Sequence, residues 1–445
     1  MNQEHFGTME PKKLFVKLAV PSLISMLFSS LYMMVDGIFV GKIIGSKALA
    51  AINLVFPIIM ISFAFGDMIA SGASVKIGIK LGEKKEKEAS EIFSVALLFI
   101  FILNIIFAVL SLIFAKDIIF ILIKDTQLAE QAYKFAYVFI CFLPIIAPFF
   151  AIDNYLRICG KAKMSMWINI SVSVLNIILD AIFIGYLKLG IEYAALASSL
   201  SMSIGTVVLI YPFITKKVVL RFTKPKIKIK EMLGIIYNGS SEFFSNISGS
   251  IMAVIMNSFL LNLGGAVGVA AYSIVMYIES LIIPMLFGVI DSVQPVISYN
   301  YGSKNNKRII TFFKITCTVA ISISIITMII IFVFPDFLVR LFSSKSDIDV
   351  INMAKTALLL YAPSYLFTWF IMTVSGFLTG LEKATSSIVL MSAESIVLPL
   401  LITLILTRFI DVYGVFVTPT ISGAISAVIA LILLRKCIKN EIKPS

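Results

Sequence analysis

The stretch GSKALAAINLVFPI at residues 45–58 decides the fold, because a diluted copy of it, GAVGVAAYSIVMYI, occurs 220 residues later at 265–278. The two copies stay in register without a gap and end on short basic loops, EKKEKE at 83–88 and SKNNKR at 303–308. Identical residues at this offset are Gly45, Ala50, Ala51, Val55, Ile58, Ile77, Gly82, Lys84, Lys87 and Phe93, which recur as Gly265, Ala270, Ala271, Val275, Ile278, Ile297, Gly302, Lys304, Lys307 and Phe313. The repeat predicts two similar lobes, the usual architecture of a transporter whose substrate site lies between them.

Composition places the chain in a lipid bilayer. Its 445 residues are 59% hydrophobic, with a mean hydropathy of +1.02, whereas soluble domains are about 45–50% apolar. A hydrocarbon layer of about 30 Å is crossed by about 20 helical residues. Twelve apolar segments meet that length, near 15–40, 49–75, 92–115, 132–155, 164–187, 193–214, 232–262, 267–297, 311–334, 354–379, 386–409 and 414–434. The predicted fold is an all-α membrane protein with twelve transmembrane helices.

The net charge of +12 follows membrane topology and gives no reason to expect a nucleic-acid partner. Most of the 37 basic residues fall in alternate loops, which are the cytoplasmic loops if both termini are cytoplasmic. The longest, KKVVLRFTKPKIKIKE at 216–231, is the expected linker between an N-terminal lobe at 1–215 and a C-terminal lobe at 232–445. Six spans in each lobe imply a parallel repeat about an axis along the membrane normal. We expect a multi-pass protein of the bacterial plasma membrane, with its linker against anionic lipid headgroups.

Residues typical of enzymes are scarce. The single histidine is His5, and the four cysteines are widely spaced without a CxxC pattern: Cys141, Cys159, Cys317 and Cys437. Neither disulfides nor a zinc site is favoured by that spacing. No catalytic Ser/His/Asp set or phosphate-binding loop is visible in the sequence. We therefore expect neither enzymatic activity nor a cofactor.

Two predicted helices carry a polar stripe that ends in an aspartate. The first stripe consists of Ser22, Ser25, Ser29, Tyr32 and Asp36, at helical steps of three and four. The second consists of Asn169, Ser173, Asn176 and Asp180. Serine contacts between helices explain the serines equally well, but an ionisable group at membrane depth costs about 2.5–3.5 kcal/mol. Asparagine would supply the same hydrogen bonds, so Asp36 and Asp180 are the stronger functional candidates.

The second lobe breaks this pattern. At the offset of 220 residues, Asp36 corresponds to Met256, and no carboxylate in the eleventh span corresponds to Asp180. Glu242 corresponds to Ser22, and it serves either the substrate cavity or a solvated vestibule. The predicted substrate-cavity residues are Tyr32, Ser29, Ser173, Glu242, Asn246 and Met256. A local hydrogen bond or interface anchor remains an equal explanation for Asp67, Glu279, Asp291 and Glu394.

Three motifs resemble the multidrug and toxic compound extrusion (MATE) transporters, in their bacterial branch. They are VDGIFVGKIIGSKALAAINLVFPI at 35–58, ASGASVKIGIKLGEKKEKEA at 70–89 and QPVISYNYG at 294–302. The resemblance extends from the first span to the twelfth. It implies two six-helix lobes around a V-shaped central cavity, and export of cationic or amphiphilic drugs and toxic organic compounds, driven by inward H⁺ or Na⁺.

The resemblance also implies site residues. The cation-coupling site, possible for Na⁺ as well as H⁺, falls on Asp36, Asn176, Asp180 and Ser198. The family's proline in the first helix falls on Pro21, which is the expected bending point because an interior proline removes a backbone hydrogen bond. Residues 354–379 contain no acid, so a cation site in the second lobe is not expected.

The mechanism predicted is antiport, in which Asp36 and Asp180 exchange a cation for the exported compound. Two carboxylates held close together resist joint ionisation, so one is expected to hold a proton. Asn176, Ser198 and free carbonyl groups would instead complete an oxygen shell for Na⁺. A flippase of lipid-linked or amphiphilic precursors is the main alternative, and a receptor or channel is a third. The chain is expected to act as a monomer.

Overall fold

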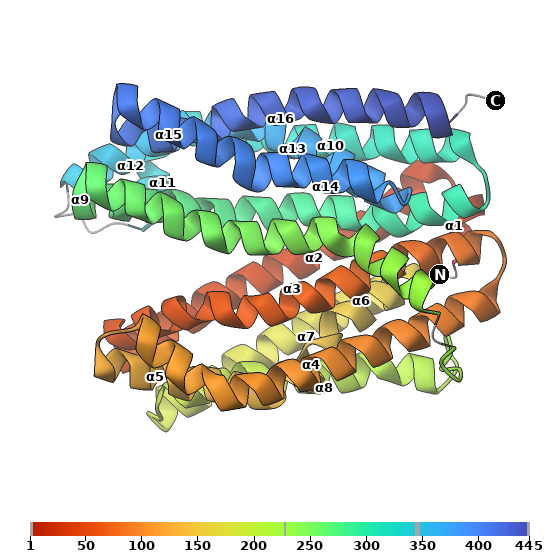
Figure 1. Ribbon diagram of the computed structural model, residues 1–445, viewed down its shortest axis with the longest axis horizontal. Coiled ribbons are helices and arrows are strands. Elements are labelled where there is room, and N and C mark those ends of the chain that lie inside the picture. The colour runs from red at the N-terminus through yellow and green to blue at the C-terminus, as the bar shows by residue number, and fades with distance from the viewer. Residues whose placement is uncertain (1–2, 227, 343–347, 443–445) are drawn as a thin grey trace.

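The computed structural model describes residues 3–226, 228–342 and 348–442, and this part of the chain forms helices and loops without a strand. The first half contains α1 (His5–Thr8), α2 (Pro11–Phe39), the π-helical η1 (Val40–Ile44), α3 (Ser46–Gly82), α4 (Glu86–Leu122), α5 (Thr126–Ile146), α6 (Pro148–Ile158), α7 (Ala162–Asp180), the π-helical η2 (Ala181–Tyr186) and α8 (Ile191–Ile214). The second half contains α9 (Ile229–Gly302), α10 (Asn306–Val333), α11 (Pro335–Arg340), α12 (Ile348–Tyr361), the 3₁₀-helical η3 (Ala362–Ser364), α13 (Tyr365–Gly380), α14 (Ala384–Ser392), the π-helical η4 (Ala393–Val397), α15 (Leu398–Ile410) and α16 (Val412–Glu441). Figure 1 shows the two halves as two bundles side by side, with the long helices running in one direction.

Eleven helices of the described residues are long and apolar enough to cross a membrane, and α9 counts for two crossings. Its helical backbone is interrupted at Gly265, with φ 60° and ψ −156°. Residues from both of its halves, Ile235 and Tyr299, lie against the same end of α3. The helix therefore reverses at Gly265, and the prediction of twelve transmembrane helices is confirmed.

The sequence repeat is also a repeat of backbone conformation. Gly45 and Gly265, which are 220 residues apart, both have a positive φ, of 124° and 60°. Lys84 and Lys304, at the same offset, have φ values of 61° and 58°. A positive φ is unfavourable for residues other than glycine, so its recurrence at equivalent loops is a strong sign of equivalent turns. The two lobes turn the chain in the same way.

The lobes are packed tightly at one end of the molecule. A Cβ atom added at Gly82 would lie 2.0 Å from the carbonyl oxygen of Tyr299, and one at Gly302 would lie 2.1 Å from that of Ile79. The same closeness holds at Gly72, against the Ile235 carbonyl, and at Gly239, against the Met68 carbonyl. Helices α3 and α9 thus touch backbone to backbone, which requires glycine at these positions.

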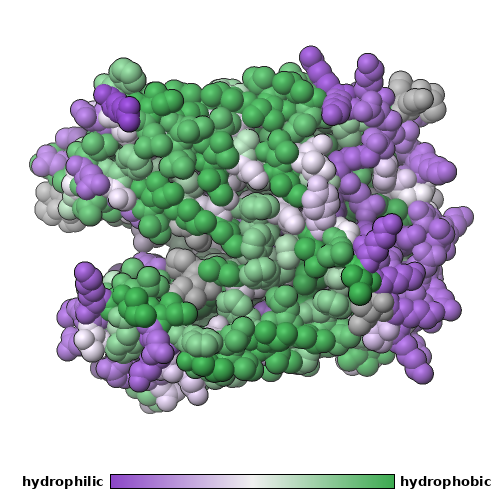
Figure 2. All heavy atoms as spheres, in the orientation of Figure 1, coloured by the Kyte–Doolittle hydropathy of each residue, from purple (hydrophilic) through white to green (hydrophobic). Residues whose placement is uncertain are grey.

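The opposite end of the molecule is open. Figure 2 shows a cleft between the two bundles at the left, whereas hydrophilic residues cover the closed end at the right. We call the closed end, which carries the loops at Lys84 and Lys304, the basic side, and the opposite end the open side. A broad hydrophobic band separates the two ends, as in a multi-pass membrane protein (Figure 2). The expected V-shaped cavity between two six-helix lobes is confirmed.

Candidate ion-coupling site

The two aspartates of the polar stripes lie next to each other near the open side. Asp36 stands in the last turn of α2 and Asp180 is the last residue of α7, and each is followed by a π-helical segment. Their carboxyl groups lie within hydrogen-bonding range of each other. Because an ionised carboxylate only accepts hydrogen bonds, a direct bond between the two requires that one of them holds a proton.

Asn176 and Ser198 complete the surroundings of this pair. The Asn176 amide lies 3.0 Å from the Ser198 Oγ of α8. In the amide orientation that satisfies all its neighbours, Asn176 donates to Asp180 Oδ2 at 3.1 Å and accepts from the Ser198 backbone N–H at 3.2 Å. The four side chains expected from the family resemblance are therefore neighbours, contributed by α2, α7 and α8.

Each aspartate keeps one oxygen without a partner. The Oδ1 atoms of Asp36 and Asp180 are buried and have no hydrogen bond among the described residues. A buried acceptor left without a partner costs about 1–3 kcal/mol, and more if it is charged. A proton or an Na⁺ ion would remove that cost, since the surrounding ligands are carboxylate, amide and hydroxyl oxygens. The donor set fits either ion.

Of the predicted cavity residues, Tyr32 lies close to this pair and interacts electrostatically with both aspartates. Ser29 is half-buried one turn before Tyr32, and Ser173 is buried one turn before Asn176. Met256 is elsewhere, in the packed interior of the second lobe, where Thr403 Oγ1 lies 3.5 Å from its sulfur. Residue correspondence between the lobes therefore does not place Met256 in the site.

Glu242 belongs to a second polar cluster, at the inner end of the cleft. Three acids interact there electrostatically, Asp67 of α3 with Glu242 and Asp291 of α9, and we call them the apex acids. Asn246 donates a hydrogen bond to Asp67 at 3.4 Å. The sequence showed each acid singly, but it did not show that they meet, because they come from three different spans.

A third polar cluster was missed by the sequence analysis. Arg157 and Asp153 of α6 form a buried ion pair of 2.7 Å, with 8% of each side chain exposed. Arg157 also donates to Ser22 of α2 and to Ser165 of α7, each at 3.1 Å. An acid and an arginine four residues apart in an apolar span were the available signal.

The acids of the second lobe have local partners. Glu279 accepts a 2.6 Å hydrogen bond from the Tyr361 hydroxyl, and Glu394 accepts one of 3.0 Å from Ser395. This is the local hydrogen bonding that the sequence left open for them. Pro21 lies inside α2, which continues through it as a helix.

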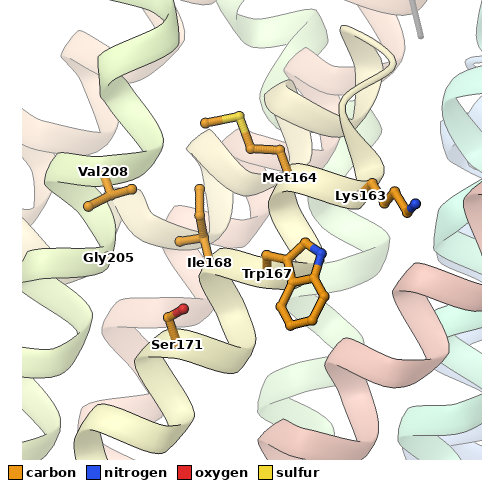
Figure 3. A pocket seen from close by; sticks show the side chains of 7 residues that line it. All are labelled: Lys163, Met164, Trp167, Ile168, Ser171, Gly205 and Val208. Atoms are coloured by element: carbon orange, nitrogen blue, oxygen red, sulfur yellow. The ribbon is translucent and has the colours of Figure 1, made fainter.

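A hollow between α7 and α8 lies apart from all these acids (Figure 3). Its lining is mostly apolar and consists of Lys163, Met164, Trp167, Ile168, Ser171, Gly205 and Val208. The Trp167 side chain is 60% exposed. Within a membrane, such a surface is suited to lipid contact, so we do not assign the hollow to the ion site.

Comparisons with known proteins agree with this geometry. The MatE family model matches residues 21–182 and again residues 243–405, one segment in each lobe. "Multidrug export protein MepA" of Staphylococcus haemolyticus is 25% identical over 429 residues, which cover 95% of this chain and 93% of that protein. "Probable multidrug resistance protein YoeA" of Bacillus subtilis is 26% identical over 360 residues, or 78% and 76% of the two chains.

Solved structures show the same architecture. An outward-facing multidrug resistance MATE family transporter of the MOP superfamily matches with a TM-score of 0.93 and 25% identity, over 99% of this chain and 98% of that one. A MATE structure in complex with MaL6 matches with a TM-score of 0.94 and 25% identity, over 99% of both chains. Since the family model spans most of the sequence and both lobes, the chain belongs to the MatE family, the MATE transporters.

Proposed function

We propose that this protein is an antiporter that exports cationic or amphiphilic organic compounds in exchange for inward H⁺ or Na⁺. One observation carries the proposal: α2 and α7 bring Asp36 and Asp180 together, each with a buried oxygen that lacks a partner. The site lies in one lobe, beside a cleft between two lobes. Two relatives are named as multidrug export or resistance proteins, which supports the class of substrate.

In this proposal, the aspartate pair binds one cation at a time. Asp36 and Asp180 accept the proton or the Na⁺ ion, while Asn176 and Ser198 hold Asp180 in place by the contacts described above. Binding of the inward ion lowers the negative charge that attracts an organic cation, so the two compete. One charge moving down 100 mV supplies about 2.3 kcal/mol, which biases two conformations roughly fiftyfold.

Alternating access is supported by the contrast between the two ends. The backbone contacts of Gly82 and Gly302 close the basic side, while the cleft leaves the other side open. Both chain ends lie towards the basic side in Figure 1. We assign the basic side to the cytoplasm, because positively charged loops remain there. The conformation is then outward-facing, like that of the solved relative with that description.

The remaining expectations become part of the proposal. The chain divides into an N-terminal lobe at 1–215, a linker at 216–231 and a C-terminal lobe at 232–445. It acts as a monomer in the plasma membrane, with lipids around it, and needs no resident cofactor and performs no enzymatic reaction. The apex acids favour organic cations over lipid-linked phosphates, which argues against the flippase alternative.

Export of a cationic dye from proteoliposomes tests the proposal, with Na⁺ and H⁺ gradients imposed separately. Asp36→Asn and Asp180→Asn keep the side-chain volume but remove the charge, so each is expected to abolish gradient-driven export. Asp117→Asn, at an exposed position of α4, is the matched control. Undiminished gradient-driven export by both site variants would contradict the assigned coupling site.

The parent protein decides the more general question. Export under one gradient only identifies the coupling ion, and export under either gradient shows that both ions serve. If neither gradient drives the dye while the protein is folded and correctly inserted, antiport of organic cations is wrong. Transfer of a fluorescent lipid between the leaflets in the same vesicles would then favour a flippase.

A further inference from the structure

Arg157 is a buried cation shared by three helices. Its guanidinium donates to Asp153 Oδ2 of α6 at 2.7 Å, to Ser165 Oγ of α7 at 3.1 Å and to Ser22 Oγ of α2 at 3.1 Å. Arginine stays charged at every pH that a protein experiences, so burial makes these partners necessary. The planar fork of the guanidinium also fixes their directions. Arg157 therefore fastens α2, α6 and α7 at one point.

Asp153 strengthens the same junction from the other side of the pair. Its second oxygen, Oδ1, accepts hydrogen bonds from Ser165 Oγ at 2.5 Å and from Asn169 Nδ2 at 2.9 Å. The carboxylate thus binds two residues of α7 while it neutralises Arg157. Because these bonds involve charged groups, they are stronger than bonds between neutral groups. Rotation or sliding of α7 against α6 would break several of them together.

The fastened helices are those that carry the coupling acids. Ser22 and Asp36 are fourteen residues apart in α2, about 21 Å at the helical rise of 1.5 Å per residue. Asn169 and Asp180 are eleven residues apart in α7, about 16 Å by the same measure. The junction therefore fixes the inner ends of the two helices whose outer ends hold the ion site. Pro21 lies directly beside the fastened Ser22, so a bend there starts at the junction.

The second lobe reaches the same junction. Asp291 of α9 interacts electrostatically with Arg157 across the boundary between the lobes. One turn earlier in α9, a Cβ atom added at Gly288 would lie 3.3 Å from the Ser22 carbonyl oxygen. The first lobe thus presents its buried cation where the second lobe presents a carboxylate, which favours closure of the lobes on this side.

We propose that Arg157 is a positioning residue for transport, which holds the inner end of α2 in the first lobe and attracts Asp291 of the second lobe in the closed state of the basic side. The inference rests on the proposed transport function. It adds a link between the two ends of the molecule: the ion site moves with α2 and α7, and Arg157 connects those helices to the lobe boundary. Arg157 touches neither the ion nor the exported compound in this role.

Three variants separate the charge of Arg157 from its geometry. Arg157→Lys keeps the charge but loses the fork, Arg157→Gln loses both, and Asp291→Asn removes only the partner in the second lobe. Arg408→Lys, at an exposed position of α15, is the matched control. If Arg157→Gln fails to fold, the other two variants still test the proposal.

The first measurement reports closure of the basic side without any transport. Ser298 is fully buried and lies where α9 meets Gly78 of α3. Ser298→Cys, with the four native cysteines replaced by alanine, is labelled in micelles with a hydrophilic maleimide. Arg157→Lys and Asp291→Asn are each expected to speed labelling about fivefold or more, since loss of a charge contact shifts the population towards the open state. Arg408→Lys is expected to leave the rate unchanged.

The second measurement uses dye export in proteoliposomes. Arg157→Lys is expected to raise, about fivefold, the concentration of the driving ion that gives half-maximal export, because α2 and α7 no longer hold their positions. A purely structural role predicts less folded protein, while labelling and ion dependence of the folded fraction stay like the parent's; that result would overturn the proposal. If the parent does not export at all, the proposed function fails, and the labelling rates still decide the role of Arg157.

Discussion

Gly45 and Gly265 turn the chain at equivalent places in the two lobes, yet the helices that they join carry different polar groups. In the first lobe, α2 and α7 bring Asp36 and Asp180 together, with unpartnered oxygens. In the second lobe, the acid Glu279 is occupied by a hydrogen bond from Tyr361. Backbone equivalence maintains the symmetric closure of the molecule, whereas a functional site requires only one lobe to keep its charges free. The two lobes are therefore comparable in their motion and unequal in their chemistry.

The largest expected effect breaks the comparison of the acids. Asp180→Asn in the first lobe is expected to lower gradient-driven export about a hundredfold, because the ion loses a charged ligand. Glu279→Gln in the second lobe keeps a hydrogen-bond acceptor for Tyr361 and is expected to change export less than about twofold. Initial rates of dye export from proteoliposomes measure both. Equal losses would mean that both lobes bind the driving ion.

The next effect sharpens the equivalence of the lobes. Gly82→Ala and Gly302→Ala each place a methyl group against a backbone carbonyl of the other lobe, at 2.0 and 2.1 Å before any adjustment. Each is expected to lower export about tenfold, since the closed basic side becomes strained. Gly249→Ala is the control, because nothing lies within 4 Å of its added Cβ. A loss at only one of the paired glycines would refute equivalent roles.

A smaller effect concerns the neutral ligands of the first lobe. Asn176→Ala removes the donor to Asp180 and the acceptor for Ser198. Loss of these bonds is expected to weaken ion affinity about tenfold, equal to about 1.4 kcal/mol. Titration of the export rate with the driving ion measures the change. An unchanged half-maximal concentration would exclude Asn176 from the site, provided that Asp180→Asn is inactive in the same assay.

The smallest effect belongs to the second lobe. Tyr361→Phe removes the donor to Glu279 and leaves that buried carboxyl group without its 2.6 Å partner. The expected cost is about 1–3 kcal/mol of stability, with export per folded molecule unchanged. Thermal unfolding in detergent and export at a temperature well below unfolding measure the two quantities. A parent-like melting temperature together with lost export would assign Tyr361 to transport and not to stability.

Part of the candidate site was predictable because its signal lies within single helices. Steps of three and four residues placed Asp36 and Asp180 on polar faces of α2 and α7, and a polar face in a membrane must turn inward. Ser198 came from the family resemblance alone. Met256 shows the limit of comparing the lobes by number, since it lies in the core of the second lobe, against Thr403. The offset records where the chain turns, but it does not record which way each helix faces.

The sequence by itself determined the twelve spans, the two repeated lobes and the turns at Gly45 and Gly265, because hydrophobic length and glycine conformation are local properties. Only the tertiary structure decided that Arg157 meets Ser22 and Asp291, and that Gly82 and Gly302 press on each other's helices. These contacts join residues more than a hundred positions apart. Their geometry depends on how the helices are rotated and how closely they approach, which packing of all the helices sets together.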